Sequence, residues 1–287
     1  GIAFRGLGDL RKAIENHQKA LRIDKEIGDR ASELACYANL GLAFDTMGDF
    51  KRAVENHEEA LEIAKGIGDK ASESKCYTNL GMAYCNLGDF GRAIEYHEKA
   101  LRMYKEIGDR AGESTCYLDL GVVYRDLGDI EKAIENYRKG LKAKRRMGDK
   151  AGEVKCLTNL GVAYHGLKNL RRAIEYHEKA RKIAMPMGDR ADEAACYGNL
   201  GLAFNGLGDF DRAINYHRKS LKIVREIGDK GGESKCYANL AAVYLNLGDS
   251  KKAIEYCEKS LLINRETGDV DSVSYTHLRA HETVLDL

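Results

Sequence analysis

A 40-residue repeat extends along almost the whole of this chain of 287 residues. A turn signal recurs once in each repeat, as Gly-Asp in every case but Lys168-Asn169, and an apolar residue follows it in most repeats, as in Gly48-Asp49-Phe50. A second Gly-Asp pair lies midway between successive signals. A fixed period of this length is typical of stacked solenoids, in which each repeat packs only against its neighbours. We therefore predict one elongated domain that works through a long surface, not a globular domain with a single core.

The charge balance says little about a partner. Forty-six Lys and Arg residues oppose 45 Asp and Glu residues, so the formal net charge is +1. Such a balance produces no overall field that would attract nucleic acid or an anionic membrane. No apolar run approaches the ~18 to 20 residues that cross a bilayer, and the start of the chain does not resemble a signal peptide. We therefore expect a cytoplasmic protein that binds neither nucleic acid nor membranes.

Both ends of the chain depart from the repeat. The segment 1–8 matches the interior segment 201–208, which predicts that the chain begins in the middle of a helix. Residues 273–287 have no counterpart in any repeat and resemble the conceptual translation of a sequencing adapter. We expect an array at 1–272, of about six and a half repeats, and a non-native tail at 273–287. The chain is thus expected to be a fragment of a longer open reading frame.

The first half of each repeat has the apolar period of a helix. In one repeat Tyr37, Leu40 and Phe44 fall at i, i+3 and i+7, which places them on one helical face. Asp29 precedes this segment as a candidate N-cap, and Gly48 follows it as a candidate C-cap. The pattern therefore predicts a helix between Asp29 and Gly48.

The second half of the repeat predicts another helix, which begins after Asp49 and ends before Gly68. Its apolar stripe consists of Phe50, Ala53, Val54, His57, Ala60, Leu61 and Ala64. Each repeat is thus two antiparallel helices of roughly 17 residues joined by short turns. Gly41 in the first helix and Ala53 in the second lack bulk where the two helices must approach closely.

The residues Leu40, Gly41 and Phe44, with Ala53 and Ala60 in the second helix, resemble the tetratricopeptide repeat. The usual repeat of that family has about 34 residues. The longer repeat and its Gly-Asp turns are similar to the subclass found in Pins-type G-protein-signalling modulators. The resemblance implies an all-α fold, a right-handed α-solenoid of stacked helix pairs, and a binding role. It implies no particular partner, because members share an architecture and little else.

Cysteine and histidine recur once in most repeats, which raises the question of a metal or disulfide site. Equivalent residues of neighbouring repeats lie at least ~8 to 10 Å apart, the distance between packed helices. Zinc holds its ligands at about 2.0 to 2.3 Å, and a disulfide joins Cα atoms within ~7 Å. We therefore interpret both rows as packing residues, namely Cys36, Cys76, Cys116, Cys156, Cys196 and Cys236, and His17, His57, His97, His177 and His217. Tyr137 and Cys257 replace the histidine in two repeats, which a metal ligand would not allow.

No nucleophile–base pair, phosphate-binding loop or pair of carboxylates stands out from the periodic background. We therefore predict a non-enzymatic chain without catalytic residues, cofactor or metal. The Glu-rich stretch of the second helix is interpreted as a solvated outer face, and it contains Glu55, Glu58, Glu59 and Glu62.

One line on the first helices differs from a freely polar exposed surface. On a helical wheel, positions 35, 39, 42 and 46 of a repeat lie opposite the packing residues. An amide and an aliphatic residue alternate along this line in repeat after repeat. The predicted groove residues are Asn39, Asn79, Asp119, Asn159, Asn199 and Asn239, the aliphatic Leu42, Met82, Val122, Val162 and Leu202, and the basic Lys75, Lys155 and Lys235.

This combination suits an extended peptide. A carboxamide both donates and accepts hydrogen bonds, so a row of asparagines can pair with a peptide backbone whatever its side chains. At ~3.3 Å per extended residue, one asparagine per repeat would engage roughly every third ligand residue. The row resembles the asparagine ladder of the O-linked N-acetylglucosamine transferase superhelix, a pattern from which Asp119 departs. The alternative, in which these amides face solvent as a by-product of repeat duplication, stays open.

The sequence favours a protein-interaction scaffold that binds an extended peptide segment of a partner in a concave groove, and we expect a monomer. The alternative is the sensor or substrate-presenting region of a larger enzyme or signalling ATPase. A catalytic or nucleotide-binding domain in the full open reading frame would favour that alternative. Nucleic-acid binding would need a basic groove, and the mixed line of Lys75, Asp119, Asp126 and Lys155 does not supply one.

Overall fold

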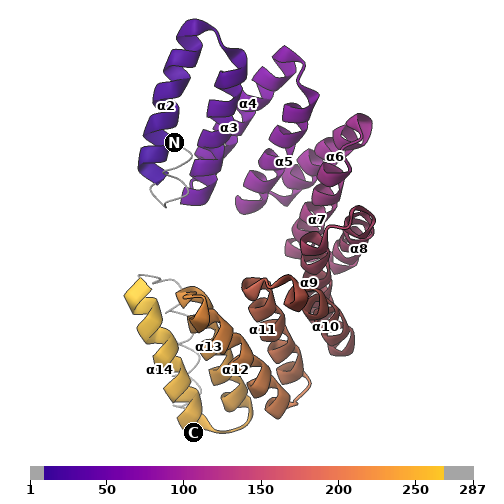
Figure 1. Ribbon diagram of the computed structural model, residues 1–287, viewed down its shortest axis with the longest axis vertical. Helices are drawn as coiled ribbons and strands as arrows, with labels where there is room; N and C mark the ends of the chain where they lie inside the picture. The colour runs from indigo at the N-terminus through magenta and orange to yellow at the C-terminus, as the bar shows by residue number, and fades with distance from the viewer. Residues whose placement is uncertain (1–9, 268–287) are drawn as a thin grey trace. The chain divides into compact units, whose positions relative to one another are not determined.

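A computed structural model describes residues 10–267, and within this range the chain forms thirteen α-helices and no strand. Consecutive helices pack against each other as antiparallel pairs from α2 to α7 and from α9 to α14 (Figure 1). The chain divides into two compact units, Gly1–Arg146 and Met147–Leu287. Within each unit the predicted all-α repeat solenoid is confirmed. The tail expected at residues 273–287 and the partial helix expected at 1–8 lie outside the described residues.

The N-terminal unit contains α2 (Leu10–Ile27), α3 (Arg30–Met47), α4 (Phe50–Ile67), α5 (Lys70–Asn86), α6 (Phe90–Ile107), α7 (Arg110–Asp126) and α8 (Ile130–Met147), and α8 reaches the boundary of the unit. The C-terminal unit contains α9 (Lys150–Gly166), α10 (Leu170–Met187), α11 (Arg190–Gly206), α12 (Phe210–Glu226), α13 (Lys230–Asn246) and α14 (Ser250–Thr267). From α3 onward, odd-numbered helices are the first helices of the repeats. Even-numbered helices are the second helices.

The Gly-Asp turns determine where the helices begin and end. The Asp29 carboxylate accepts a hydrogen bond from the backbone N–H of Ser32 and so caps α3. Gly48 ends that helix in the left-handed conformation, with φ of 78°. Asp49 and Gly68 play the same roles for α4. The predicted boundaries of both helices are therefore confirmed.

Lys168 departs from this turn chemistry. It has φ of 59° and is the one residue other than glycine with positive φ among residues 10–267. A side chain in this conformation strains the backbone by about 1 kcal/mol or more. Asn169 replaces the capping aspartate at the same turn and still accepts a hydrogen bond from the backbone N–H of Arg172 at 3.3 Å.

We expect Lys168→Gly to raise the free energy of unfolding by about 1 kcal/mol, because glycine adopts the left-handed conformation without steric cost. Gly208 occupies the equivalent turn of the next repeat with φ of 76°, so Gly208→Lys is the matched reverse substitution. It should lower stability by a similar amount. Urea denaturation measures both changes. Unchanged midpoints for the two variants would show that this turn carries no strain.

The core of each repeat forms where a ring from the second helix lies against a glycine of the first. A Cβ atom on Gly41 would lie only 2.3 Å from Cε1 of the fully buried His57. Glycine is therefore required at this position. The same close approach pairs Gly81 with His97, Gly121 with Tyr137, Gly161 with His177, and Gly201 with His217. The histidines are thus buried packing residues, as predicted.

The six periodic cysteines are buried in the same core and all have free thiols. One apolar cluster of the N-terminal unit joins Leu40 of α3, Leu61 of α4 and Leu80 of α5. A cluster of the C-terminal unit joins Leu221 of α12 to Leu240 of α13. Each core therefore continues from one repeat to the next, as expected for a solenoid.

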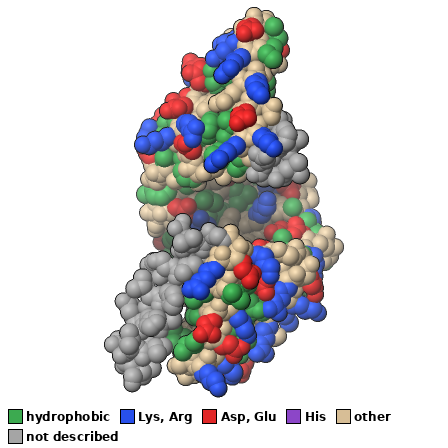
Figure 2. All heavy atoms as spheres, turned by 90° about the vertical axis from the view of Figure 1, so that its left-hand side faces the viewer, with side chains coloured by type: hydrophobic (Ala, Val, Ile, Leu, Met, Phe, Trp, Pro, Cys, Tyr) green, Lys and Arg blue, Asp and Glu red, His purple; other side chains and the backbone are tan. Residues whose placement is uncertain are grey.

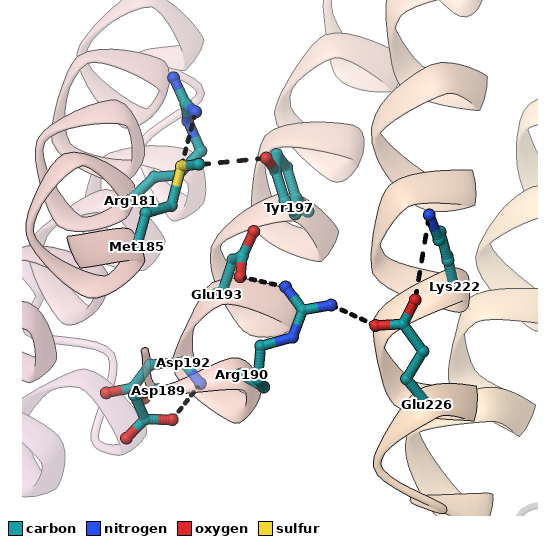
Figure 3. Close-up of polar contacts among 9 residues, drawn as sticks. All are labelled: Arg181, Met185, Asp189, Arg190, Asp192, Glu193, Tyr197, Lys222 and Glu226. Carbon is teal, nitrogen blue, oxygen red and sulfur yellow. Dashed lines mark hydrogen bonds and ion pairs between the residues drawn. The ribbon is translucent and has the colours of Figure 1, made fainter. Parts of the chain in front are cut away.

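Polar contacts join neighbouring helices along one edge of the C-terminal unit (Figure 3). Arg190 of α11 forms ion pairs with Glu193 of its own helix and with Glu226 of α12. Lys222 of α12 also lies 3.9 Å from Glu226. Glu193 is buried, so its pair with Arg190 satisfies a carboxylate that is largely removed from water.

Two substitutions compensate each other at the same edge. In α4 the equivalent positions hold Leu61 and Lys65, and Lys65 lies 5.9 Å from the ring of the next tyrosine in the chain. In α10 they hold Arg181 and Met185, so the cation has moved by one helical turn. Arg181 still lies 5.8 Å from the ring of Tyr197, and its guanidinium contacts the Met185 sulfur (Figure 3). The cation–aromatic contact is therefore kept by a different residue.

Candidate peptide-binding groove

The first helices of successive repeats contact each other directly. In the N-terminal unit α3 contacts α5, and α5 contacts α7; in the C-terminal unit α9 contacts α11, and α11 contacts α13. The first helices therefore form a continuous layer within each unit. The predicted line of groove residues lies along this layer.

The structure places the predicted line at the surface of both units. Lys75, Lys155 and Lys235 are exposed. Among the aliphatic residues Met82 is 47% exposed and Leu202 is 38% exposed. Leu42, Val122 and Val162 are half-buried. The line is thus a surface with apolar character, separate from the core beneath it.

The five asparagines of the line are half-buried, and their amides have no hydrogen-bond partner among residues 10–267. They are Asn39 and Asn79 in the N-terminal unit, and Asn159, Asn199 and Asn239 in the C-terminal unit. Asparagines elsewhere behave differently. Asn56 donates to the Arg52 carbonyl at 2.7 Å, and the Asn246 amide donates to Asn205 Oδ1 at 3.1 Å. The amides of the line therefore remain available for another partner.

Asp119 occupies the same position in the third first-helix of the N-terminal unit. Its Oδ2 is buried and accepts no hydrogen bond from any described residue. Burial raises the pKa of this carboxyl from 3.8 to about 7, and the charge of Lys144 opposes the shift. Near neutral pH the group is therefore only partly ionised. The carboxyl that interrupts the asparagine row carries much less charge than the sequence implies.

A second row of residues, which we call the variable row, borders the line, and the sequence analysis missed it. It contains Asp45, Cys85, Arg125, His165, Asn205 and Leu245, which are equivalent positions of the first helices. His57 Nε2 lies 3.0 Å from Asp45 Oδ2, so this row lies directly above the buried rings. The six positions hold six different residue types. That variation between near-identical repeats was the available signal, and a search for shared residues overlooks it.

A surface pocket of about 850 Å³ lies apart from the line, at the turn between α5 and α6. Part of its polar wall is already paired, because Arg92 forms an ion pair with Asp89 at 2.5 Å and lies over the Tyr84 ring at 4.1 Å. None of the predicted groove residues lines it. The line of unpaired amides is therefore the better candidate site.

Charge does not concentrate on the face of the molecule that Figure 2 shows. Basic and acidic side chains are interspersed there. Among the described residues no group of three or more His, Cys, Asp or Glu side chains could hold a metal ion. None of the helices described is both long enough and apolar enough to cross a membrane.

Solved structures with similar folds extend over most of the chain. The apo form of RapI is similar with a TM-score of 0.74 and 17% identity, covering 93% of this chain and 96% of that one. A Rap protein complexed with competence and sporulation factor gives a TM-score of 0.68 and 15% identity, covering 96% and 79%. At these identities the likeness shows the fold alone.

A third similar structure is a signal transduction ATPase with numerous domains from Pyrococcus horikoshii, which has a tetratricopeptide repeat sensor. The TM-score is 0.71 with 20% identity, and the match covers 94% of this chain but only 45% of that protein. A comparison with curated protein sequences gave no match.

Family models of the tetratricopeptide repeat cover most of the sequence. One matches residues 1–66, 74–146 and 153–226, and a second matches residues 234–266. These ranges follow the helix pairs of the structure from one repeat to the next. The chain belongs to the tetratricopeptide repeat family.

Proposed function

We propose that this chain is a non-catalytic scaffold that binds an extended peptide segment of a partner protein along its first helices. The observation that carries the proposal is the row of five half-buried asparagine amides without an internal partner. In the free protein, water must satisfy these amides. A peptide backbone offers a carbonyl and an N–H group that can replace this water without loss of hydrogen bonds.

The residues beside the amides support the same ligand. Exposed Met82 and Leu202 offer apolar surface for ligand side chains. The variable row that begins with Asp45 presents a different side chain in each repeat. The amides would thus hold the backbone of any sequence, whereas the variable row would favour particular ligand side chains.

Two of the similar structures are consistent with a role in protein interaction. One is a Rap protein in complex with a competence and sporulation factor, and the other contains a tetratricopeptide repeat sensor. The second also favours the alternative function, in which this chain is the sensor region of a larger signalling ATPase. The Pins-type subclass, a right-handed superhelix, a monomeric state and a cytoplasmic location stay predictions.

A triple substitution tests the groove. We expect Asn79→Ala/Asn159→Ala/Asn199→Ala to lose roughly 0.5 to 1.5 kcal/mol of binding energy at each amide, because each loses a donor and an acceptor. Affinity should fall by about one to three orders of magnitude. The ligands are selected from a peptide array with the unmodified chain and titrated by calorimetry. Melting curves should be unchanged, because the amides form no hydrogen bond within residues 10–267.

Asn56→Ala is the matched control, since this amide lies on α4 and bonds to its own helix. It should bind the selected peptides normally. The asparagine row is not the site if the selected peptides bind the triple variant as tightly as the parent. The same conclusion follows if substitution of Glu55 and Glu58 on the outer face weakens their binding.

A further inference from the structure

Three cations form a line along α8, the last helix of the N-terminal unit (Figure 1 labels this helix). Arg138, Lys142 and Arg146 are spaced at i, i+4 and i+8, so they lie on one side of the helix, and all three are exposed. Arg145 is exposed beside them, and Lys144 is half-buried. We call Arg138, Lys142 and Arg146 the basic line of α8.

No other second helix of the described chain has this pattern. The equivalent line mixes signs or contains neutral residues in every other case, namely Gln18, Arg22 and Glu26; Glu58, Glu62 and Gly66; Glu98, Arg102 and Glu106; Glu178, Lys182 and Pro186; Arg218, Lys222 and Glu226; and Glu258, Leu262 and Glu266. The repeats are otherwise near copies of each other. The basic line is therefore a local change on a shared framework.

The basic line is unfavourable for the helix that carries it. Like charges at i and i+4 repel each other and destabilise a helix. Nearer the start of α8, Lys132 pairs with Asp129 and Lys139 pairs with Glu135, but α8 contains no carboxylate after Glu135. Within the described structure Lys142 and Arg146 form no ion pair. The helix therefore supplies no carboxylate that relieves the repulsion between Lys142 and Arg146.

The helix dipole explains only part of the arrangement. Cations are favoured in the last turn of a helix, where they face the unpaired carbonyls. Arg146 lies in that turn, but Arg138 lies more than two turns from the end of α8 at Met147. The helix dipole therefore accounts for Arg146 and not for the rest of the line.

We propose that the basic line of α8 binds an acidic segment of a partner protein. The line is about 12 Å long, because eight residues separate its ends at 1.5 Å per residue. Guanidinium groups at both ends can each bind a carboxylate through two hydrogen bonds. The line therefore matches two to four carboxylates on a short segment.

The surroundings of the line disfavour nucleic acid. Glu131 and Glu135 lie on the N-terminal part of the same helix, so the basic surface along α8 is short. A duplex carries one charge for about every 1.7 Å of its axis and needs a longer uninterrupted basic surface. Phosphates beyond the line would be repelled by these glutamates. A short acidic peptide avoids that repulsion because its carboxylates need not extend past the line.

The test uses the full chain and a fluorescent peptide of eight glutamates as the probe, with fluorescence anisotropy as the readout. The variant is Arg138→Glu/Lys142→Glu/Arg146→Glu. The matched control is Arg102→Glu/Lys182→Glu/Lys222→Glu, which makes the same change in net charge but places one substitution on each of three helices. The variant Arg138→Gln/Lys142→Gln/Arg146→Gln removes the repulsion and serves if the first variant does not fold.

We expect the probe to bind the parent chain more weakly as salt rises, and to lose about tenfold or more in affinity in the α8 variants. The control should lose less than about threefold. The groove variant Asn79→Ala/Asn159→Ala/Asn199→Ala should bind this probe normally, which separates the two sites. Equal losses in the α8 variant and the control would overturn the proposal, because net charge alone would explain them. If single-stranded DNA bound through the same line more tightly than the glutamate probe, the ligand would be nucleic acid and the proposal of an acidic peptide would be wrong.

Discussion

The array is expected to lose most of its stability as the pH falls from 6.5 towards 4. Burial lowers the pKa of His97, His177 and His217 from 6.5 to about 4, and the charge of the neighbouring His165 contributes to the shift of His177. These rings lie against the glycines of the first helices, and Nδ1 of each has no hydrogen-bond partner among the described residues. A proton on any of them would be a buried charge without a partner.

Lowered histidine pKa values make the protein less stable at acidic pH. Each of these histidines has a folded pKa below its ordinary value, so the unfolded chain binds the proton more readily. The stabilising contribution is complete above pH 6.5 and is lost as the pH falls towards about 4. A shift of this size corresponds to about 3 kcal/mol for each histidine. Three such losses are comparable to the roughly 5 to 15 kcal/mol that stabilises a typical domain.

Tyrosine substitutions provide the test, because Tyr137 already occupies the same position against Gly121. The variant His97→Tyr/His177→Tyr/His217→Tyr should unfold with a much flatter pH dependence between pH 6.5 and 4.5. The reciprocal variant Tyr137→His adds one more buried histidine at the equivalent position and should make the dependence steeper. Urea denaturation at a series of pH values measures each slope, so a change in stability at neutral pH does not affect the conclusion.

The capping aspartates cannot produce the same effect in this window. Hydrogen bonds from the side chain and backbone of Arg52 lower the pKa of Asp49 below 3.8, and Arg212 does the same for Asp209. Their contribution is lost only below about pH 4. If the tyrosine variant retained the full slope above pH 4.5, other groups would be responsible for acid unfolding and the histidine explanation would be wrong.

The helix boundaries were predictable because each one depends on a short local signal. Asp49 caps α4 through its own carboxylate, and Gly68 ends α4 by adopting φ of 72°. Neither role requires knowledge of a distant contact. The all-α class followed from the same repeated signals, since a period of this length leaves room for two helices and two turns. The helical wheel also placed the amide line on the surface, because position 79 lies about opposite the centre of the stripe formed by Tyr77, Leu80, Gly81 and Tyr84.

Features that depend on pairs of residues from different helices were not predictable. The sequence indicated that Gly41 and Ala53 allow close approach, but it did not show that Gly41 faces the ring of His57. At another contact, a Cβ atom on Gly112 would lie 2.3 Å from the ring of Tyr104, whereas Ser72 occupies the equivalent position in the preceding repeat. Such size complementarity is visible only when the partners are known.

The electrostatic state of Asp119 was likewise hidden, because burial and not residue type determines it. The sequence shows an acidic residue in a row of amides. The structure shows that its Oδ2 is buried without a hydrogen-bond donor, so ionisation is unfavourable. A wheel can place this residue at the surface of the helix but cannot show how much of its carboxyl the neighbouring helices cover.

Asp119→Asn should therefore stabilise the protein, and more so at higher pH. The folded pKa of Asp119 is raised from 3.8 to about 7, so this group contributes its full stability below pH 3.8 and loses it as the pH rises towards 7. Asparagine cannot ionise. Its advantage over aspartate should grow by about 2 to 3 kcal/mol between pH 5 and pH 8. Urea denaturation of both proteins at the two pH values measures this difference.

The reverse substitution is available in the same unit, because Asn79 holds the equivalent position on α5. Asn79→Asp should introduce a penalty that also increases with pH, provided that the neighbouring helices cover this position in the same way. A pH-independent difference between Asp119→Asn and the parent would show that the Asp119 carboxyl is solvated or paired.

The opposite pH trends of Asp119 and the buried histidines place the maximum of stability where the rings are already neutral and the carboxyl is not yet fully ionised. Removing the carboxyl should therefore shift that maximum to higher pH.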